Sequence, residues 1–181
     1  MKSSYQNKLD YSDLISSLVF LVKPKRIIEF GILEGYSLQT MADNITSECE
    51  IIAYDIFDKF DGNSAKNEEL LTQFKNYSNV SILYGDFYEQ FNNIEDESID
   101  ILHIDIANNG DIVEFVFQNY ISKLTSHGIL ILEGGSLARD NIEWMNKYNK
   151  PKIYPILQKY KEKYDILTLG EIPSITIVKK K

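Results

Sequence analysis

The sequence predicts an α/β protein: a doubly wound, seven-stranded sheet, mostly parallel, that ends in an antiparallel hairpin and carries helices on both faces. Short, continuously apolar runs, typical of strands covered on both faces, alternate with segments whose apolar residues recur at helical spacing. Near the end, two strand-like runs, 165–169 and 174–178, are joined by only four residues. A parallel crossover needs about a dozen residues or more, so the last strand is expected to run antiparallel to the one before it.

The elements of this sheet follow one another along the chain in a regular order. A first helix is expected from Ser12, and it should stop before Pro24, because the residue before a proline avoids the helical region. The runs with the length and composition of strands are 26–30, 50–54, 80–84, 99–106 and 128–132. The apolar stripes that indicate the intervening helices are Leu38, Met41 and Ile45; Leu70, Leu71, Phe74 and Tyr77; and Val113, Val116, Phe117, Tyr120, Ile121 and Leu124.

Composition narrows the classes of function. The 181 residues, 44% of them hydrophobic, suit a single domain over 1–181, with residues 1–10 and 179–181 expected to be flexible. The formal net charge of −8 disfavours a nucleic-acid partner. The chain has no apolar run near the roughly 20 residues that span a bilayer, no apolar signal segment near Met1, and a single cysteine. These features predict a cytoplasmic protein without a membrane partner.

Ligands of open α/β sheets bind outside the carboxyl ends of the strands, so the residues that follow each strand are the candidates for a site. After the first strand, Gly31 and Gly35 bracket a tight turn into a helix. Glycine there permits positive φ and lets a ligand approach the backbone closely. Two glycines are commonly just a turn, and their spacing is not the G-x-G-x-x-G of dinucleotide sites. Their position after a first strand favours a ligand-binding turn.

The second and third strands also end in acidic residues. Asp55 lies 20 residues beyond Gly35, where a carboxylate can accept both hydroxyls of a ribose; the alternative is a solvated loop acid or a helix cap. Gly85-Asp86-Phe87 follows the third strand. An acid beside an aromatic ring can hold an adenine, but a turn aspartate with a core phenylalanine gives the same pattern.

The fourth and fifth strands end in further polar groups. His103 and Asp105 are two residues apart, so they share one face of a strand. Burying these polar groups is costly unless they are paired or functional. A core histidine whose hydrogen bonds are made within the protein is as good an interpretation of His103 as a functional one. Glu133 precedes Gly134-Gly135, which indicates either close approach of the backbone to a ligand or a solvated acid in a flexible turn.

Together these segments resemble the class I S-adenosylmethionine (SAM)-dependent methyltransferases, which have a Rossmann-like fold. The turn from Glu29 to Gly35 resembles the family's first motif, and the closing antiparallel hairpin resembles its topological hallmark. The resemblance covers about Tyr11 to Lys179 and implies SAM as the cofactor. It implies a cofactor site formed by Glu29, Gly31, Gly35, Ser37, Asp55, Ile56, Asp86, Phe87 and Asp105.

Within that superfamily, His103-Ile104-Asp105 is similar to the branch of macrocin-type sugar O-methyltransferases and, more distantly, to catechol-type enzymes. That branch commonly holds a divalent cation, for which Asp105 and Glu133 would match two ligands. Gly134 stands where a third ligand is expected, and Ala107 and Asn108 replace a second Asp and a His. We therefore assign no metal ligands, although magnesium could still bind two carboxylates and water.

The resemblance implies methyl transfer to a small-molecule acceptor, such as a hydroxyl of a sugar or a related metabolite. Asp105 or His103 is the candidate general base, and Glu133 would orient the acceptor or help to hold a cation. Arg139 could pair with an anionic substrate, but a surface position is the favoured interpretation. The segments expected to build the acceptor pocket are 57–64, 108–111 and 134–140.

Other functions remain open on the sequence alone. A nicotinamide-dependent oxidoreductase is the nearest enzymatic alternative, but the glycine spacing and the terminal hairpin both disfavour it. A non-catalytic protein that kept the cofactor fold is a second alternative, and a scaffold that binds no nucleotide is a third. The sequence does not decide between a monomer and a homodimer.

Overall fold

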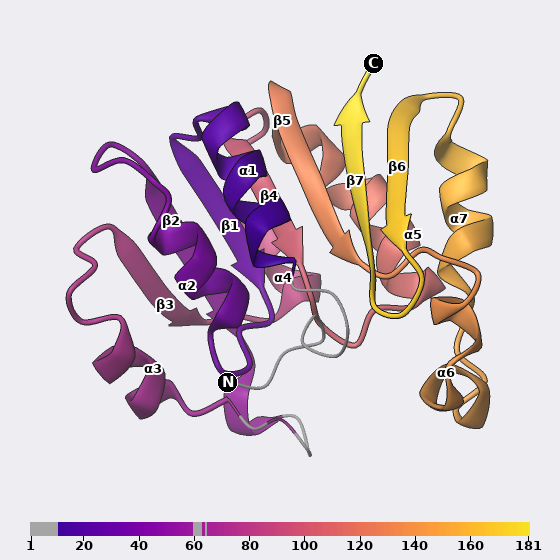
Figure 1. Ribbon diagram of the computed structural model, residues 1–181, viewed down its shortest axis with the longest axis horizontal. Helices are drawn as coiled ribbons and strands as arrows, with labels where there is room; N and C mark the ends of the chain where they lie inside the picture. The colour runs from indigo at the N-terminus through magenta and orange to yellow at the C-terminus, as the bar shows by residue number, and fades with distance from the viewer. Residues whose placement is uncertain (1–10, 60–62, 64) are drawn as a thin grey trace.

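A computed structural model describes residues 11–59, 63 and 65–181. Seven strands form one sheet with the order β3-β2-β1-β4-β5-β7-β6 (Figure 1). The strands are β1 (Arg26–Phe30), β2 (Glu50–Asp55), β3 (Val80–Tyr84), β4 (Ile99–Ile104), β5 (Leu124–Glu133), β6 (Tyr164–Gly170) and β7 (Ser174–Lys180). The α-helices are α1 (Ser12–Val22), α2 (Tyr36–Ala42), α3 (Asn67–Gln73), α4 (Phe87–Gln90), α5 (Gly110–Asn119), α6 (Glu143–Lys147) and α7 (Ile153–Tyr160). Four 3-10 turns are η1 (Phe57–Lys59), η2 (Phe91–Asn93), η3 (Ile121–Lys123) and η4 (Arg139–Asn141).

The sheet is parallel from β3 to β5 and antiparallel at β7. Strand β2 lies beside β1, and β3 lies beside β2 at the edge of the sheet. Strand β4 lies on the other side of β1. Strand β7 runs antiparallel to both of its neighbours, β5 and β6. The predicted seven-stranded, doubly wound sheet with an antiparallel hairpin is therefore confirmed. The reversal of strand order puts a topological switch point between β1 and β4.

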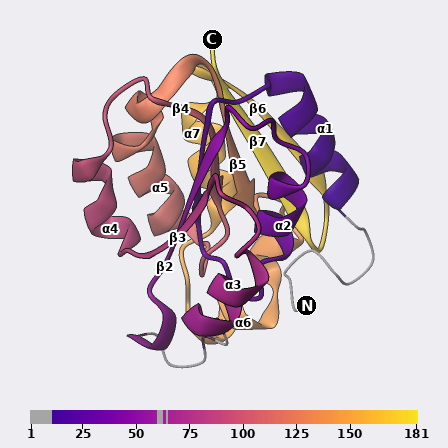
Figure 2. The same ribbon diagram turned by 90° about the vertical axis from the view of Figure 1, so that its left-hand side faces the viewer.

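Helices cover both faces of the sheet, as the sequence predicts. Figure 2 shows α1 and α2 on one side of the strands and α4 and α5 on the other. Successive strand residues point to opposite faces, so Ile27 packs under α1 and α2 whereas Ile28 packs under α5 and α7. Each face of the sheet thus has its own apolar core, and the central strands β1, β4 and β5 are mostly apolar because both of their faces are buried.

Several element boundaries differ from those that the sequence indicates. Strand β5 begins at Leu124, which the apolar stripe had placed on the preceding helix; it pairs with Ile99 of β4. The three polar residues that follow Leu124 hide this start from a search for apolar runs. Strand β4 ends at Ile104, two residues earlier than expected. The first helix does end before Pro24, where Lys23 takes a left-handed conformation with φ of 51°.

Residues 179–181, for which flexibility is expected, include the last two residues of β7. Lys179 pairs with Ile129 of β5 and Asp165 of β6, and Lys180 pairs with Tyr164. Strand β7 lies between β5 and β6, and its residues 175–179 pair with both neighbours. Residues 1–10, for which flexibility is also expected, lie outside the described residues. In the described parts of the chain, none of the helices combines the length and apolar composition that crossing a membrane requires.

Candidate functional site

A cavity of about 440 Å³ lies at the carboxyl ends of the parallel strands, next to the switch point between β1 and β4. The segments that follow four neighbouring strands line it, together with residues of α2 and α5. The predicted cofactor residues among its lining are Gly31, Ser37, Asp55, Ile56, Asp86, Phe87 and Asp105. Glu29, Gly35, His103 and Glu133 are not among the lining residues. The strand ends therefore bring together most of the residues that the sequence singles out.

The turn after β1 depends on its glycines. Gly31 has a φ of 91°, and a Cβ atom there would overlap the backbone oxygen of Asp105. Gly35 has a φ of 79° directly before α2, and a Cβ atom there would come within 2.9 Å of the ring of Phe74. Leu33 between them also has a positive φ of 50°. Gly31 thus lets the turn pack against the end of β4, whereas Gly35 lets the start of α2 pack against the segment after α3.

Asp55 connects two loops at the edge of the cavity. Its Oδ2 atom accepts a hydrogen bond from the backbone N–H of Ile32 at 2.8 Å. Its Oδ1 atom accepts from the backbone N–H of Phe57 and from Nδ2 of Asn63, both at 2.7 Å. A carboxylate has about four acceptor positions, so three donors leave room for one more, such as a ligand hydroxyl.

Asp86 and Phe87 match the interpretation as a turn aspartate and a core phenylalanine, and both residues also line the cavity. The Oδ1 atom of Asp86 accepts from the backbone N–H of Tyr88 at 2.8 Å and caps α4. The ring of Phe87 stacks on that of Tyr120 with centroids 5.0 Å apart, and it meets Phe30 edge to face. Burial raises the pKa of the neighbouring Tyr88, so its phenol stays protonated at neutral pH.

A buried polar network lies behind the turn. The Oε1 atom of Glu29 accepts a hydrogen bond from Oγ of Ser37 at 2.5 Å and lies 2.8 Å from Nδ1 of His103. Burial by itself would lower the pKa of His103, but the hydrogen bond and charge of Glu29, with the charges of Asp105 and Glu133, raise it above its ordinary value. Ser37 lines the cavity, so this network supports the cavity wall from inside the protein.

Asp105 and His103 do not both reach the cavity, although they are two residues apart. His103 is the penultimate residue of β4 and is fully buried against Glu29. Asp105 lies one residue beyond the end of β4, and its backbone N–H donates to the oxygen of Phe30 at 2.9 Å. The alternation of a strand no longer fixes the direction of a residue beyond its end, which explains why only Asp105 lines the cavity.

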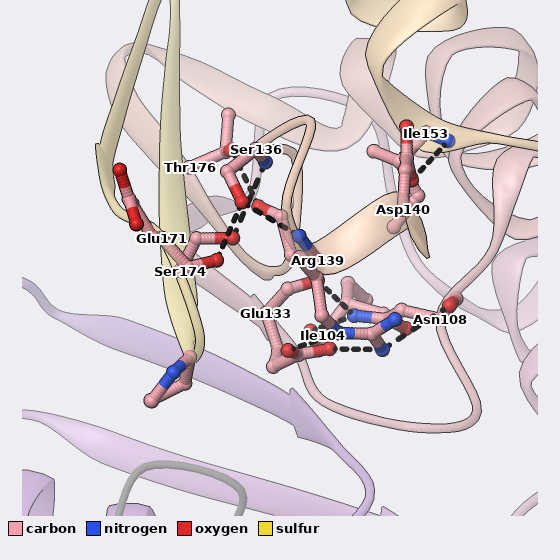
Figure 3. Close-up of polar contacts among 12 residues, drawn as sticks. Ile104, Asn108, Glu133, Ser136, Arg139, Asp140, Ile153, Glu171, Ser174 and Thr176 are labelled. Atoms are coloured by element: carbon pink, nitrogen blue, oxygen red, sulfur yellow. Dashed lines mark hydrogen bonds and ion pairs between the residues drawn. The ribbon is translucent and has the colours of Figure 1, made fainter. Parts of the chain in front are cut away.

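Glu133 forms a buried ion pair with Arg139 (Figure 3). Nε of Arg139 donates to Oε1 of Glu133, and Nη2 donates to Oε2, both at 2.7 Å. The expectation that Arg139 lies on the surface is therefore wrong, since only 7% of the residue is exposed. The chain turns back after β5 through Gly134 and Gly135, whose φ values are 100° and 114°, and this reversal brings Arg139 under the strand end.

Two neighbours of this ion pair, Asn108 and Asp140, lie in segments that the sequence singles out, but their hydrogen-bond partners are not predicted from the sequence. Asn108 donates from Nδ2 to the backbone oxygens of Ile104 at 2.8 Å and Glu133 at 2.9 Å, joining the ends of β4 and β5. Asp140 accepts from the backbone N–H groups of Ile153 and Tyr154, both at 2.8 Å, and so fixes the start of α7. A polar residue in a loop gives no local sequence signal for partners this distant.

The segments expected to build an acceptor pocket contribute unequally to the cavity. Of the loop 57–64, Asn63 lines it, and residues 60–62 and 64 lie outside the described residues. Residues 108–111 and 134–140 are not among its lining residues. Those two segments instead belong to the network around Glu133 and Arg139.

Comparison with known proteins gives one family and one distant relative. A family model described as a methyltransferase domain matches residues 28–133. The uncharacterized protein y4gI of Sinorhizobium fredii is 28% identical over 124 residues, which are 63% of this chain and 13% of that protein. This chain therefore spans only a small part of the length of the curated relative that it matches.

Solved structures resemble the chain over nearly its whole length. SAH-bound PaMTH1, a methyltransferase of Podospora anserina, has 18% identity and a TM-score of 0.69, covering 98% of this chain and 80% of its own. TomG of Streptomyces achromogenes, an O-methyltransferase of tomaymycin synthesis in complex with SAM, has 14% identity and a TM-score of 0.72, covering 98% and 82%. An O-methyltransferase of Bacillus cereus in complex with SAH has 18% identity and a TM-score of 0.71, covering 98% and 84%. At these identities the likeness shows the fold.

Proposed function

This chain belongs to the methyltransferase-domain family, and from that premise we propose that it transfers the methyl group of SAM to an oxygen of a small molecule, such as a hydroxyl of a sugar or related metabolite. The observation that carries the proposal is the cavity in which Gly31, Asp55, Phe87 and Asp105 meet. The solved structures with the same fold include O-methyltransferases in complex with SAM and with SAH, its demethylated product. Family membership also disfavours the nicotinamide alternative.

The cavity suits SAM in size and charge. Its volume of about 440 Å³ lies in the range of small-molecule sites, which is roughly 300–1,000 Å³. Its lining is largely apolar, but it includes the carboxylates of Asp55, Asp86 and Asp105. SAM has two positively charged groups, the sulfonium and the ammonium, and one carboxylate. Its net charge is therefore positive, and acidic residues around the cavity complement it.

Each lining residue has a role that follows from its chemistry. Asp55 would accept from the ribose with its remaining acceptor position, and Phe87 with Asp86 would face the adenine. Gly31 and Ser37 would border the amino-acid end of the cofactor. Ile56 would pack beside the nucleoside. Glu29 and Gly35 would act from behind the cavity, through Ser37 and the start of α2 respectively.

Methyl transfer requires alignment of the acceptor and, for a hydroxyl, removal of its proton. When bound, the cofactor supplies an electrophilic methyl group. Asp105 lines the cavity and is the general base that we assign. His103 is a positioning residue in this scheme, because its Nδ1 atom is engaged by Glu29 and it is buried. Glu133 is held by Arg139 and would orient the loop after β5.

Calorimetric titration with S-adenosylhomocysteine (SAH) tests the cofactor directly. We expect one equivalent of SAH to bind with micromolar affinity, and Asp105→Asn to keep most of that affinity. Transfer of a labelled methyl group from SAM to a pool of hydroxylated metabolites then tests the reaction, and Asp105→Asn should abolish it. A folded wild-type protein that binds no SAH would refute the proposal.

A further inference from the structure

The end of β5 lacks the features of a divalent cation site. The resemblance to catechol-type enzymes offers Asp105 and Glu133 as two ligands, but both carboxylate oxygens of Glu133 accept hydrogen bonds from Arg139. Gly134 supplies no side chain at the third position. Within residues 11–59, 63 and 65–181, His, Cys, Asp and Glu side chains nowhere form a group of three that could hold a metal ion.

A positive charge is nevertheless present at this place. The side chains of Arg139 and Glu133 are 9% and 4% exposed, so the guanidinium lies in the protein interior. Burial by itself would lower the pKa of Arg139, but the hydrogen bonds and charge of Glu133, with the charges of Asp105 and Asp140, raise it. The guanidinium thus stays protonated and experiences the charges of the same two acids, Asp105 and Glu133, that a cation would bridge.

Arg139 also joins the strand ends that a shared cation would join. Asn108 donates to the backbone of Ile104, the last residue of β4, and to that of Glu133, the last residue of β5. Nη2 of Arg139 reaches the backbone oxygen of Asn108 at 3.5 Å while it is bonded to Glu133. A metal ion bound to Glu133 would have to displace this guanidinium and leave it buried without its carboxylate, which is unfavourable.

We propose that the Arg139 guanidinium takes the place of the divalent cation at the ends of β4 and β5, so that this chain binds its ligands and transfers methyl groups without a metal ion. The part that concerns methyl transfer rests on the proposed function. The part that concerns the cation does not, because it follows from the contacts of Glu133 alone. Arg139 is a positioning residue in this scheme: it holds the side chain of Glu133 and contacts the backbone oxygen of Asn108.

Binding of Mn²⁺, followed by electron paramagnetic resonance with and without SAH, tests this inference on the wild-type protein. We expect no stoichiometric Mn²⁺ at millimolar concentration, and SAH affinities that agree within twofold in EDTA and in magnesium. One equivalent of Mn²⁺ bound at micromolar concentration by the wild type, and lost in Glu133→Gln, would overturn the inference. Absence of SAH binding would count against the proposed function only.

Removal of the guanidinium gives a second test, in which Mn²⁺ binding is expected to increase. Arg139→Ala frees the carboxylate of Glu133 beside Asp105, and Mn²⁺ should then bind at least tenfold more tightly than to the wild type. The matched double variant, Arg139→Ala with Glu133→Gln, should lose that gain. A folded Arg139→Ala protein with no gain would refute the claim that the guanidinium occupies a cation's place. If the single variant does not fold, the wild-type titration still decides.

Discussion

Nδ1 of His103 lies 2.8 Å from Oε1 of Glu29, with the two residues opposite each other on β4 and β1. They are 74 positions apart in the sequence, and the exposed fractions are 1% for His103 and 0% for Glu29. The pair therefore joins the two strands that flank the switch point. Glu29 also accepts a hydrogen bond from Ser37, which lines the cavity. The charge state of the buried His103 side chain is therefore linked, through Glu29, to a residue of the cavity wall.

The first prediction concerns the pH dependence of stability. The pKa of His103 is raised in the folded protein, so the stability that its charge contributes is fully present below the unfolded value of about 6.5 and is lost as pH rises through the folded value. The free energy of unfolding in urea should decline as pH rises above about 6.5. His103→Gln should be less stable throughout and should lose this decline.

The second histidine provides the control. His127 is exposed, and the chain has two histidines in all, so His127→Gln should keep the wild-type pH profile. If the decline disappeared in His127→Gln and persisted in His103→Gln, the pairing with Glu29 would not be its origin.

The second prediction concerns the turn after β1. Gly31→Ala places a Cβ atom against the backbone oxygen of Asp105 at a positive φ, so the turn must move. We expect a loss of about 1–3 kcal/mol in the free energy of unfolding and at least a tenfold loss of SAH affinity by calorimetry.

Gly128→Ala is the matched control for Gly31→Ala. Gly128 lies in β5 and is not among the residues that line the cavity. A Cβ atom there would lie 2.6 Å from the backbone oxygen of Ile99. This variant should also lower the melting temperature, but its folded form should bind SAH within twofold of the wild type. Equal losses of affinity in both variants would indicate a general effect of lowered stability.

The third prediction concerns Asp55. Asp55→Ala removes a carboxylate that accepts from Ile32, Phe57 and Asn63, and with it the acceptor that we propose for the ligand's ribose. Hydrogen bonds to a charged group are worth about 1.5–3 kcal/mol, so SAH affinity should fall by about tenfold to a hundredfold. Asp58, an exposed acid three residues later, is the control, and Asp58→Ala should bind SAH normally.

The fourth prediction concerns the energy of the buried ion pair. Arg139→Met leaves Glu133 buried without its partner and should lower the free energy of unfolding by about 3–5 kcal/mol. The double variant Arg139→Met with Glu133→Met replaces both charges by apolar groups and should recover most of that loss. Urea unfolding of the wild type, the single variants Arg139→Met and Glu133→Met, and the double variant gives the coupling energy. A double variant less stable than Arg139→Met alone would contradict the prediction.

The sequence predicts the sheet well because buried parallel strands leave a clear pattern. Strands β1 and β3 have the predicted bounds, since the predominantly apolar runs 26–30 and 80–84 coincide with them. The start of β5 is not predicted, because three of the four side chains in 124–127 are polar and only Leu124 pairs with β4 there. Helix ends are equally hard to locate: Ile45 continues the stripe of α2 beyond the end of the helix.

The sequence predicts the site residues only at the carboxyl ends of parallel strands, where ligands of open α/β sheets bind. Gly31, Asp55 and Asp105 follow parallel strands, and that position alone brings them to one cavity. The partners of Glu133 and Asp140 depend on how the chain reverses between 134 and 153, and no periodicity encodes that path. The pairing of Glu29 with His103 requires knowledge that β4 lies beside β1, which the order of strands along the chain does not reveal by itself.

The position of β7 between β5 and β6 has a consequence for synthesis of the protein on the ribosome. Strand β5 can pair with β4 once residue 133 has left the ribosome, but its other edge has no partner until β7 has left it too. During that interval an apolar strand presents free backbone groups, which is the state in which nascent chains associate with one another or with chaperones. Removing residues 174–180 would make that exposed state permanent, so expression trials of this protein should retain the last strand in full.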